Sequence, residues 1–196
     1  MDNPPNATPA TCRAQAHAGL QRGDVALAEE AFLRLLDVQP DDAEALQFLA
    51  SLQLNRGNAA RAIELLLAAL RTQPQDAAIL HQLGSAQMLA GDLQAAADSL
   101  RQGLQLGPGM FVARLRLGVV FEQQGRRHDA MTAYLGAINA AQAHGRWLSD
   151  ATTAPGVRDA VKHAMQYVAV ARRELFDAII EPLRQRYGRS ELARVD

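Results

Sequence analysis

The sequence predicts an all-α fold, a right-handed α-solenoid of four helix pairs followed by a long capping helix, on three observations. A unit of 34 residues recurs without insertion. Three residue types keep their phase within it: Gly23, Gly57, Gly91 and Gly125; Ala28, Ala62, Ala96 and Ala130; Pro40, Pro74 and Pro108. Hydrophobic residues make up 48% of the chain and aromatic residues only 5%, which suits closely packed helices. A fixed period of this length is typical of stacked helix pairs.

The chain divides in order into a leader, four repeats and a C-terminal segment. Residues 1–8 form a polar leader that we expect to be disordered. The predicted repeats are 9–42, 43–76, 77–110 and 111–142, and a linker at 143–156, a capping helix at 157–188 and a tail at 189–196 follow. A cap is expected because the last apolar face of a solenoid otherwise meets solvent.

The first repeat has an irregular first helix and a regular second helix. Cys12, Gln15 and Ala16 occupy positions where later repeats place leucines and a small residue. A weak terminal unit is expected because its outer face has no neighbouring repeat. The apolar face of the second helix consists of Ala28, Phe32, Leu35 and Leu36.

The second and third repeats are the most regular. The packing stripe of their first helices is predicted at Leu46 and Leu49 and at Leu80 and Leu83. Beside it, Ala50 and Gly84 are small enough for the second helix to approach closely. Gly57 and Gly91 are predicted to end the first helix with a positive φ, and Asn58 and Asp92 to cap the next. Asp42 and Asp76 are predicted N-caps of the helices that follow Pro40 and Pro74.

The repeat pattern ends after the fourth unit. Gln142 stands in the proline phase, and the linker carries Trp147, the only tryptophan. The capping helix shows an apolar stripe at spacings of three and four: Val157, Val161, Met165, Val168, Leu175, Ile179 and Leu183, with Arg172 in the same phase. Pro182 is expected to kink or interrupt this helix because it lacks a backbone donor.

Bulk composition limits the classes of function. The formal net charge is −1, so no general attraction to nucleic acid or to an acidic membrane surface is expected. A single cysteine, Cys12, permits no internal disulfide. The N-terminus lacks the features of a signal peptide, and no apolar run is long enough for a membrane span. We therefore expect a soluble cytoplasmic protein.

The phase pattern resembles the tetratricopeptide repeat. The positions that carry the resemblance in the third repeat are Leu80, Leu83, Gly84, Gln87, Ala96, Leu100, Gly103 and Pro108, and in the fourth Arg114, Leu117, Gly118, Phe121, Ala130, Tyr134 and Ala137. The missing tryptophan-type first position and Gly103 in place of the last alanine depart from the pattern. The resemblance covers residues 9–142 and implies a superhelix that binds proteins or peptides.

A second resemblance extends over the repeats, the linker segment 145–148 (GRWL) and the C-terminal helix. Together they are similar to the N-terminal half of bacterial aspartyl/asparaginyl β-hydroxylase-type proteins, in which the repeats precede an iron- and 2-oxoglutarate-dependent domain. The sequence ends at Asp196, before such a domain, so no catalytic residue can be carried over. The alternative is a stand-alone adaptor or assembly scaffold of the chaperone type.

The sequence offers no catalytic, cofactor-binding or metal-binding constellation. The histidines, His17, His81, His128, His144 and His163, form no metal-ligand pair of known spacing. Cys12 has only Arg13 as a basic neighbour and is not expected to be a nucleophile. The C-terminal arginines alternate with acidic residues, which indicates a solvated helix face. We expect no enzyme activity and no cofactor in this chain.

Binding is therefore the expected function, at a groove formed by the first helix of each pair. The candidate groove residues are Arg13, His17, Gln47, Ser51, Asn55, His81, Ser85, Met88, Val119 and Glu122. The same phase also includes Gln21, Glu44, Leu115 and Gln123. These polar side chains suit an extended peptide. Some relatives in the repeat family grip a terminal carboxylate, but Ala78 and Gln82 occupy two of the positions required for this, which disfavours such a ligand.

Overall fold

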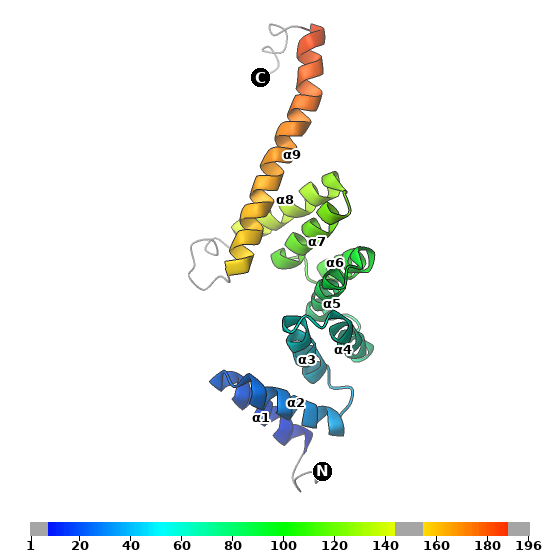
Figure 1. The fold of residues 1–196 in the computed structure, drawn as a ribbon, viewed down its shortest axis with the longest axis vertical. Helices are drawn as coiled ribbons and strands as arrows, with labels where there is room; N and C mark the ends of the chain where they lie inside the picture. The colour runs from blue at the N-terminus through cyan, green and yellow to red at the C-terminus, as the bar shows by residue number, and fades with distance from the viewer. Residues whose placement is uncertain (1–7, 144–154, 188–196) are drawn as a thin grey trace. The chain divides into compact units, whose positions relative to one another are not determined.

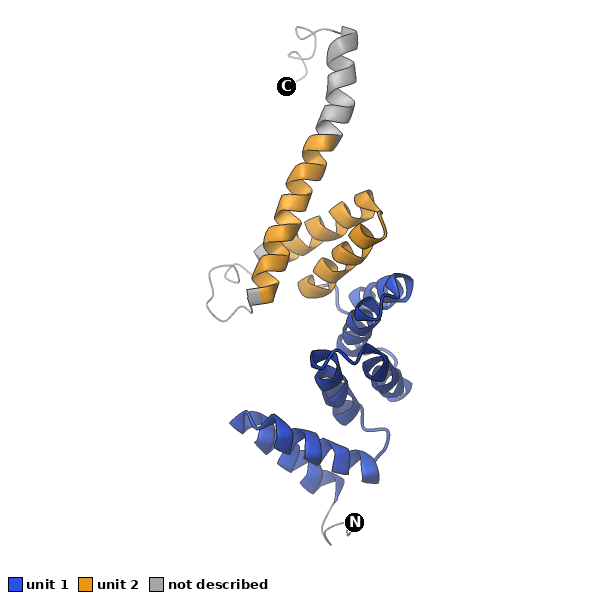
Figure 2. Cartoon of the chain, in the orientation of Figure 1, with its two compact units in different colours: residues 1–108 blue, residues 109–196 orange. Residues whose placement is uncertain are grey.

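The computed structural model describes residues 8–143 and 155–187, and within them all secondary structure is α-helical (Figure 1). The chain separates into two compact units, residues 1–108 and 109–196 (Figure 2). Unit 1 contains α1 (Pro9–Arg22), α2 (Val25–Val38), α3 (Ala43–Asn55), α4 (Ala59–Thr72), α5 (Ala77–Leu89) and α6 (Leu93–Leu106). Unit 2 contains α7 (Phe111–Gln123), α8 (Arg127–Ala143) and α9 (Pro155–Tyr187).

The described helices pack in pairs. The helices contact each other within α1–α2, α3–α4, α5–α6 and α7–α8. Inside unit 1, α2 packs on α3, α4 packs on α5, and α3 also touches α5, so successive pairs are stacked. Inside unit 2, α9 packs on both α8 and α7.

The turn between the two helices of a pair depends on its glycine, as predicted. Gly57 and Gly91 have φ of 78° and 83°, a left-handed conformation that costs other residues about 1–2 kcal/mol. The chain reverses with a backbone bond of 2.9 Å from the Asp92 N–H to the Gln87 carbonyl, and the Asp92 carboxylate then caps α6 by accepting from the Ala95 N–H. Glycine at this phase has a positive φ in all four pairs: Gly23, Gly57, Gly91 and Gly125.

One predicted cap forms differently. Asn58 stands at the N-cap position of α4, but its side chain makes no capping hydrogen bond. Its Nδ2 instead donates to Gln53 Oε1 over 2.9 Å, so the amide is engaged with the preceding helix. Asp42 and Asp76 cap α3 and α5 as predicted.

The core follows the repeat phase. The alanines at the crossing point of each pair and the large side chains one turn later are fully buried: Ala28, Ala62, Ala96, Ala130, Phe32, Leu66, Leu100 and Tyr134. The predicted stripe of the first helices, Leu46, Leu49, Leu80 and Leu83, is also buried. The positions of these side chains were therefore predicted correctly from their spacing.

The weak first helix is better formed than its sequence suggests. Thr8, assigned above to the leader, is the N-cap of α1 and shares a reciprocal capping box with Thr11. Cys12 and Ala16 are buried against the second helix, while Gln15 is exposed. The rest of the predicted leader, residues 1–7, lies outside the described residues.

Helix α9 is continuous from Pro155 to Tyr187 and is not interrupted at Pro182. Among its side chains up to residue 174, which are those that the structure describes, the buried ones are Val161, Ala164 and Val168. The predicted stripe included Met165, but this side chain is 46% exposed because it lies about 100° around the helix from Ala164. Trp147, most of the predicted linker and the tail lie outside the described residues.

Close approach within the α7–α8 pair gives a testable consequence. A Cβ at Gly118 would lie 2.4 Å from the ring of the buried Tyr134, so we expect Gly118→Ala to destabilise the protein by about 1–3 kcal/mol. The matched control is Gly136→Ala on α8, where the atom nearest to the added Cβ is Arg114 Nη1 at 3.4 Å. Because alanine has the higher helix propensity, this variant should stabilise the protein by about 1 kcal/mol. Urea denaturation followed by circular dichroism measures the free energy of unfolding of both variants. Equal changes in the two variants would contradict the tight contact at Gly118.

Candidate functional site

The predicted groove residues fall on the first helices of the pairs. In unit 1 they lie on α1 (Arg13, His17), on α3 (Gln47, Ser51, Asn55) and on α5 (His81, Ser85, Met88). Val119 and Glu122 lie on α7 in unit 2. The two groups are therefore considered separately.

Two predicted residues line a hollow in unit 1. This hollow, called the aromatic hollow below, has a volume of about 220 Å³ and is lined by Leu20, Phe32, Glu44, Gln47, Phe48, Ser51 and Gln82. Gln47 and Ser51 were predicted from their phase, and Glu44 shares that phase. Side chains from three successive pairs thus meet at one place.

The apolar part of this hollow comes from residues that sequence reasoning did not assign to it. The Phe32 and Phe48 rings pack with their centroids 4.7 Å apart, Phe32 fully buried and Phe48 half-buried. Leu20 borders them and is 43% exposed. One signal in the sequence could have found Phe48: it shares its phase with Gln82, in the next repeat, which lines the same hollow.

The polar part is a short chain of hydrogen bonds. Gln82 Nε2 donates to Ser51 Oγ over 3.2 Å, and Ser51 Oγ donates to the Gln47 carbonyl over 3.1 Å. Gln82 Oε1 is shielded from solvent and accepts no hydrogen bond from the described residues. A buried acceptor without a donor costs free energy, so this carboxamide has an unused capacity to bind an N–H group.

The two basic candidates, Arg13 and His17, are already paired within the chain. The Arg13 guanidinium contacts the Asp42 carboxylate and lies 3.5 Å from Glu44 Oε2. His17 Nε2 lies 2.7 Å from Glu44 Oε1. Asp42 is only 5% exposed and also accepts from the Ala45 N–H, so its carboxylate is fully engaged.

A second hollow adjoins the aromatic hollow, because Glu44 lines both. This acidic hollow has a volume of about 410 Å³ and is lined by Arg13, Gln39, Asp41, Asp42, Ala43, Glu44, Thr72 and Gln73. It contains three carboxylates and one guanidinium, and Asp41 is exposed. The local charge is therefore negative.

The remaining candidates do not line these two hollows. Ser85 Oγ donates to the His81 carbonyl over 2.8 Å, and Asn55 is exposed at the end of α3. Met88 is half-buried on α5, as Val119 is on α7, while Gln21 and Gln123 are exposed. Leu115 was assigned wrongly to the groove face: it is 3% exposed and belongs to the core of unit 2.

Glu122 joins the three helices of unit 2. Its Oε2 accepts hydrogen bonds from Tyr134 Oη on α8, at 2.7 Å, and from His163 Nε2 on α9, at 2.9 Å. Burial acts to raise the pKa of the Glu122 carboxyl, but the bonds from His163 and Tyr134 outweigh it, so the pKa lies below its usual 4.5. Burial and the neighbouring carboxylate raise the pKa of the Tyr134 hydroxyl well above its usual value.

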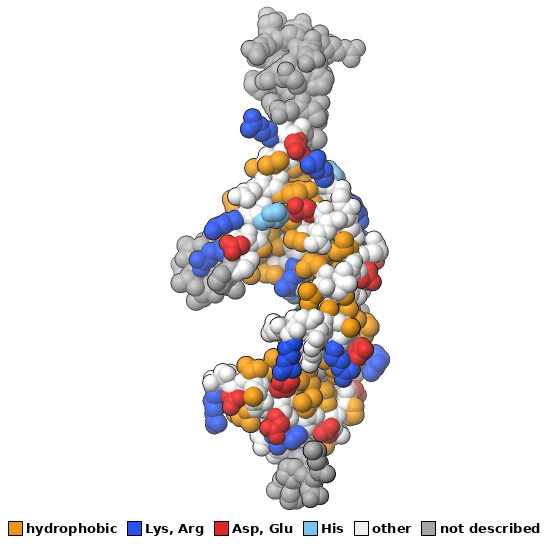
Figure 3. All heavy atoms as spheres, in the orientation of Figure 1, with side chains coloured by type: hydrophobic (Ala, Val, Ile, Leu, Met, Phe, Trp, Pro, Cys, Tyr) orange, Lys and Arg blue, Asp and Glu red, His pale blue; other side chains and the backbone are white. Residues whose placement is uncertain are grey.

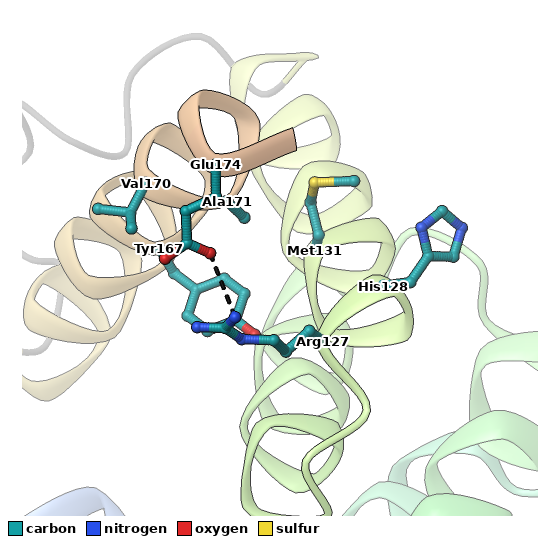
Figure 4. Close-up of a pocket in the computed structure, with 7 residues that line it drawn as sticks. All are labelled: Arg127, His128, Met131, Tyr167, Val170, Ala171 and Glu174. Atoms are coloured by element: carbon teal, nitrogen blue, oxygen red, sulfur yellow. Dashed lines mark ion pairs between the residues drawn. The ribbon is translucent and has the colours of Figure 1, made fainter. Parts of the chain in front are cut away.

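Unit 2 also has a hollow of about 330 Å³ between α8 and α9, which the sequence did not predict (Figure 4). Its walls are Arg127, His128 and Met131 from α8 and Tyr167, Val170, Ala171 and Glu174 from α9. Arg127 Nη1 lies 3.3 Å from Glu174 Oε2, which ties the two helices together. The lining is mainly apolar and carries both signs of charge.

The described ranges contain neither a cluster of metal-ligating side chains nor a helix that could span a membrane. Across residues 8–143 and 155–187, no group of three or more His, Cys, Asp or Glu side chains is arranged to hold a metal ion. Among the same residues, no helix combines the length and apolarity needed for a membrane span. On the face shown in Figure 3, acidic and basic side chains stand beside one another.

The sequence matches the tetratricopeptide repeat family model over residues 13–77 and 81–145. These stretches cover more than half of the chain, so the chain belongs to the tetratricopeptide repeat family. The predicted all-α solenoid of helix pairs is confirmed. A comparison with curated protein sequences gave no significant match.

Solved structures show the same fold. MamA superposes with a TM-score of 0.64 at 24% identity, over 87% of this chain and 93% of that chain. The Sgt2 TPR domain from Aspergillus fumigatus superposes with a TM-score of 0.56 at 21% sequence identity, over 70% of this chain and 81% of that chain. A mutant O-GlcNAc transferase from Thermobaculum terrenum superposes with a TM-score of 0.61 at 28% sequence identity, over 71% of this chain and 27% of that chain. A fold of this class commonly mediates protein interactions.

The hydrogen bonds to Glu122 give a pH-dependent prediction. Because its pKa is lower in the folded chain, ionised Glu122 stabilises the fold at neutral pH, and this contribution disappears as the pH falls through the folded value. We expect Glu122→Gln to cost about 1 kcal/mol at pH 7 and progressively less below pH 4.5. Urea denaturation at several pH values measures this.

The control for this prediction is Asp159→Asn on α9, whose carboxylate is 76% exposed and lies 3.8 Å from Lys162. An exposed pair of this kind contributes little. If Glu122→Gln lowers the free energy of unfolding by the same amount at pH 3 as at pH 7, the role of the ionised carboxylate is contradicted.

Proposed function

We propose that this chain is a non-catalytic protein- or peptide-binding module whose site is the aromatic hollow with the adjoining faces of α1, α3 and α5. The observation that carries this proposal is the convergence of three successive helix pairs on one hollow. A half-buried aromatic floor stands there beside amide and hydroxyl groups. Such a surface suits an extended segment, whose side chains need pockets and whose backbone needs hydrogen-bond partners.

The side-chain bridges between the first helices support a preformed site. Arg13 and His17 of α1 reach Glu44 of α3, and Gln82 of α5 reaches Ser51 of α3. These contacts hold the three helix faces in a fixed arrangement before any ligand binds. A preorganised site loses less conformational entropy on binding.

The predicted outcome is loss of binding when the polar lining is removed. Peptides selected from a displayed random library on the intact chain would be synthesised and their Kd measured by fluorescence anisotropy. We expect the triple variant Gln47→Ala, Ser51→Ala, Gln82→Ala to weaken binding at least tenfold, since each lost bond contributes about 0.5–1.5 kcal/mol.

The control is Leu67→Ala on α4, an exposed side chain that is not among the residues lining the aromatic hollow. Both variants should keep the helical circular dichroism of the original chain. Undiminished binding by the triple variant would place the site elsewhere.

For the larger context, we propose that the module recruits substrates or partners for an aspartyl/asparaginyl β-hydroxylase-like protein in the bacterial cytoplasm. The resemblance of the repeats, the 145–148 segment and the C-terminal helix supports this. The alternative is a stand-alone adaptor or assembly scaffold of the chaperone type. Reading the gene beyond the codon for Asp196 separates them: an in-frame domain with iron-binding histidines supports the first, and a stop codon overturns it.

A further inference from the structure

We propose that the site selects segments that place an apolar side chain in the aromatic hollow and a Lys or Arg in the acidic hollow beside it, and that it rejects acidic segments. This inference rests on the proposed function and names the ligand class for the same site. It follows from the charges, the apolar lining and the free acceptor of unit 1.

The charges decide which ligands are excluded. A ligand carboxylate could reach a cation here only by taking Arg13 from Asp42, whose side chain is buried. Asp42 is buried while the Arg13 side chain is 38% exposed, so taking Arg13 away would leave the buried carboxylate without its cation, which is unfavourable. His17 is likewise held by Glu44. The two basic side chains among the groove candidates of unit 1 that could meet an anion are therefore already paired.

The same charges favour a cation. The acidic hollow contains Asp41, Asp42 and Glu44 against Arg13 alone. Asp41 is exposed, so its carboxylate can meet an ammonium or guanidinium group, and Glu44, which is 47% exposed and already contacts Arg13 and His17, adds negative charge beside it. Complementary electrostatic potentials on the two sides of an interface mainly determine specificity and association rate, so these carboxylates would favour a basic ligand over an acidic one.

The position of Glu44 sets the spacing between the two ligand side chains. This residue lines both hollows, so the apolar and cationic sites share a wall. Successive side chains of an extended backbone point to opposite sides, and residues two apart point to the same side about 6.5 Å away. An apolar residue and a Lys or Arg within two positions of each other fit this arrangement.

The aromatic hollow supplies the apolar anchor and a backbone contact. The half-buried ring of Phe48 and the exposed part of Leu20 offer apolar surface that a ligand side chain would remove from water. A small rotation of the Gln82 carboxamide would present Oε1, which has no partner in the described chain, to a backbone N–H of the ligand.

The test uses a random dodecapeptide display library selected on the intact chain. We expect enriched peptides to contain Lys or Arg within two positions of a Leu, Ile, Met or aromatic residue. In the strongest synthetic binder, replacing the basic residue by Glu, or the apolar residue by Ser, should each weaken Kd at least tenfold at low ionic strength. The charge effect should shrink at high salt.

Variants of the chain assign the effect to the acidic hollow. Glu44→Gln and Asp41→Asn should each reduce the penalty for charge reversal in the peptide. Glu64→Gln should not, because this carboxylate lies on α4, pairs with Arg61 and is absent from both hollow linings. Asp41 is exposed, so its variant is expected to keep the structure intact.

The outcomes separate this inference from the function on which it rests. If the triple variant of Gln47, Ser51 and Gln82 loses binding but charge reversal in the peptide does not weaken it, the cation preference is overturned and the proposed binding site stands. Enrichment of acidic peptides would overturn it as well. Binding indifferent to both sets of variants, or no enriched peptide at all, would overturn the inference and the proposed function together.

Discussion

The fold depends on the close approach of two helices within each pair. The approach requires a small residue on the first helix opposite a large one on the second: Gly84 faces Leu100, and Gly118 faces Tyr134. At both glycines an added Cβ would lie less than 3.0 Å from its neighbour. The left-handed glycine of the turn and the buried alanine of the crossing point serve the same contact. This constraint explains why the turn glycine and the crossing-point alanine keep one phase over the repeats.

Most of the fold could be predicted because it is local and periodic. Spacing alone identified the buried positions, the glycines with positive φ and three of the four caps assigned to the second and third repeats. Two of the departures have different causes. Asn58 bonds to Gln53 instead of capping α4, and Met165 turns outward because the buried face of α9 passes through Ala164.

The candidate site was less accessible from the sequence, for a physical reason. Phase shows which face a residue occupies but not which neighbours have already engaged it. Arg13, His17 and Glu122 lie on first helices as expected, yet each is bonded to residues 27 to 41 positions away. The apolar floor under Gln47 and Ser51 is formed by Phe32 and Phe48, which come from different helices. Such combinations appear only when the pairs are stacked.

The hydrogen bonds of Glu122 have a consequence for how α9 is positioned. The rest of the seam on α7 and α8 includes the buried apolar side chains Ala164 and Val168, the edge-on packing of Tyr167 against Tyr134 and the Arg127–Glu174 ion pair. Sliding would separate His163 from Glu122 and leave a partly buried carboxylate with one donor fewer. The hydrogen bond from His163 therefore disfavours a shift of α9 along the seam and contributes to its single register.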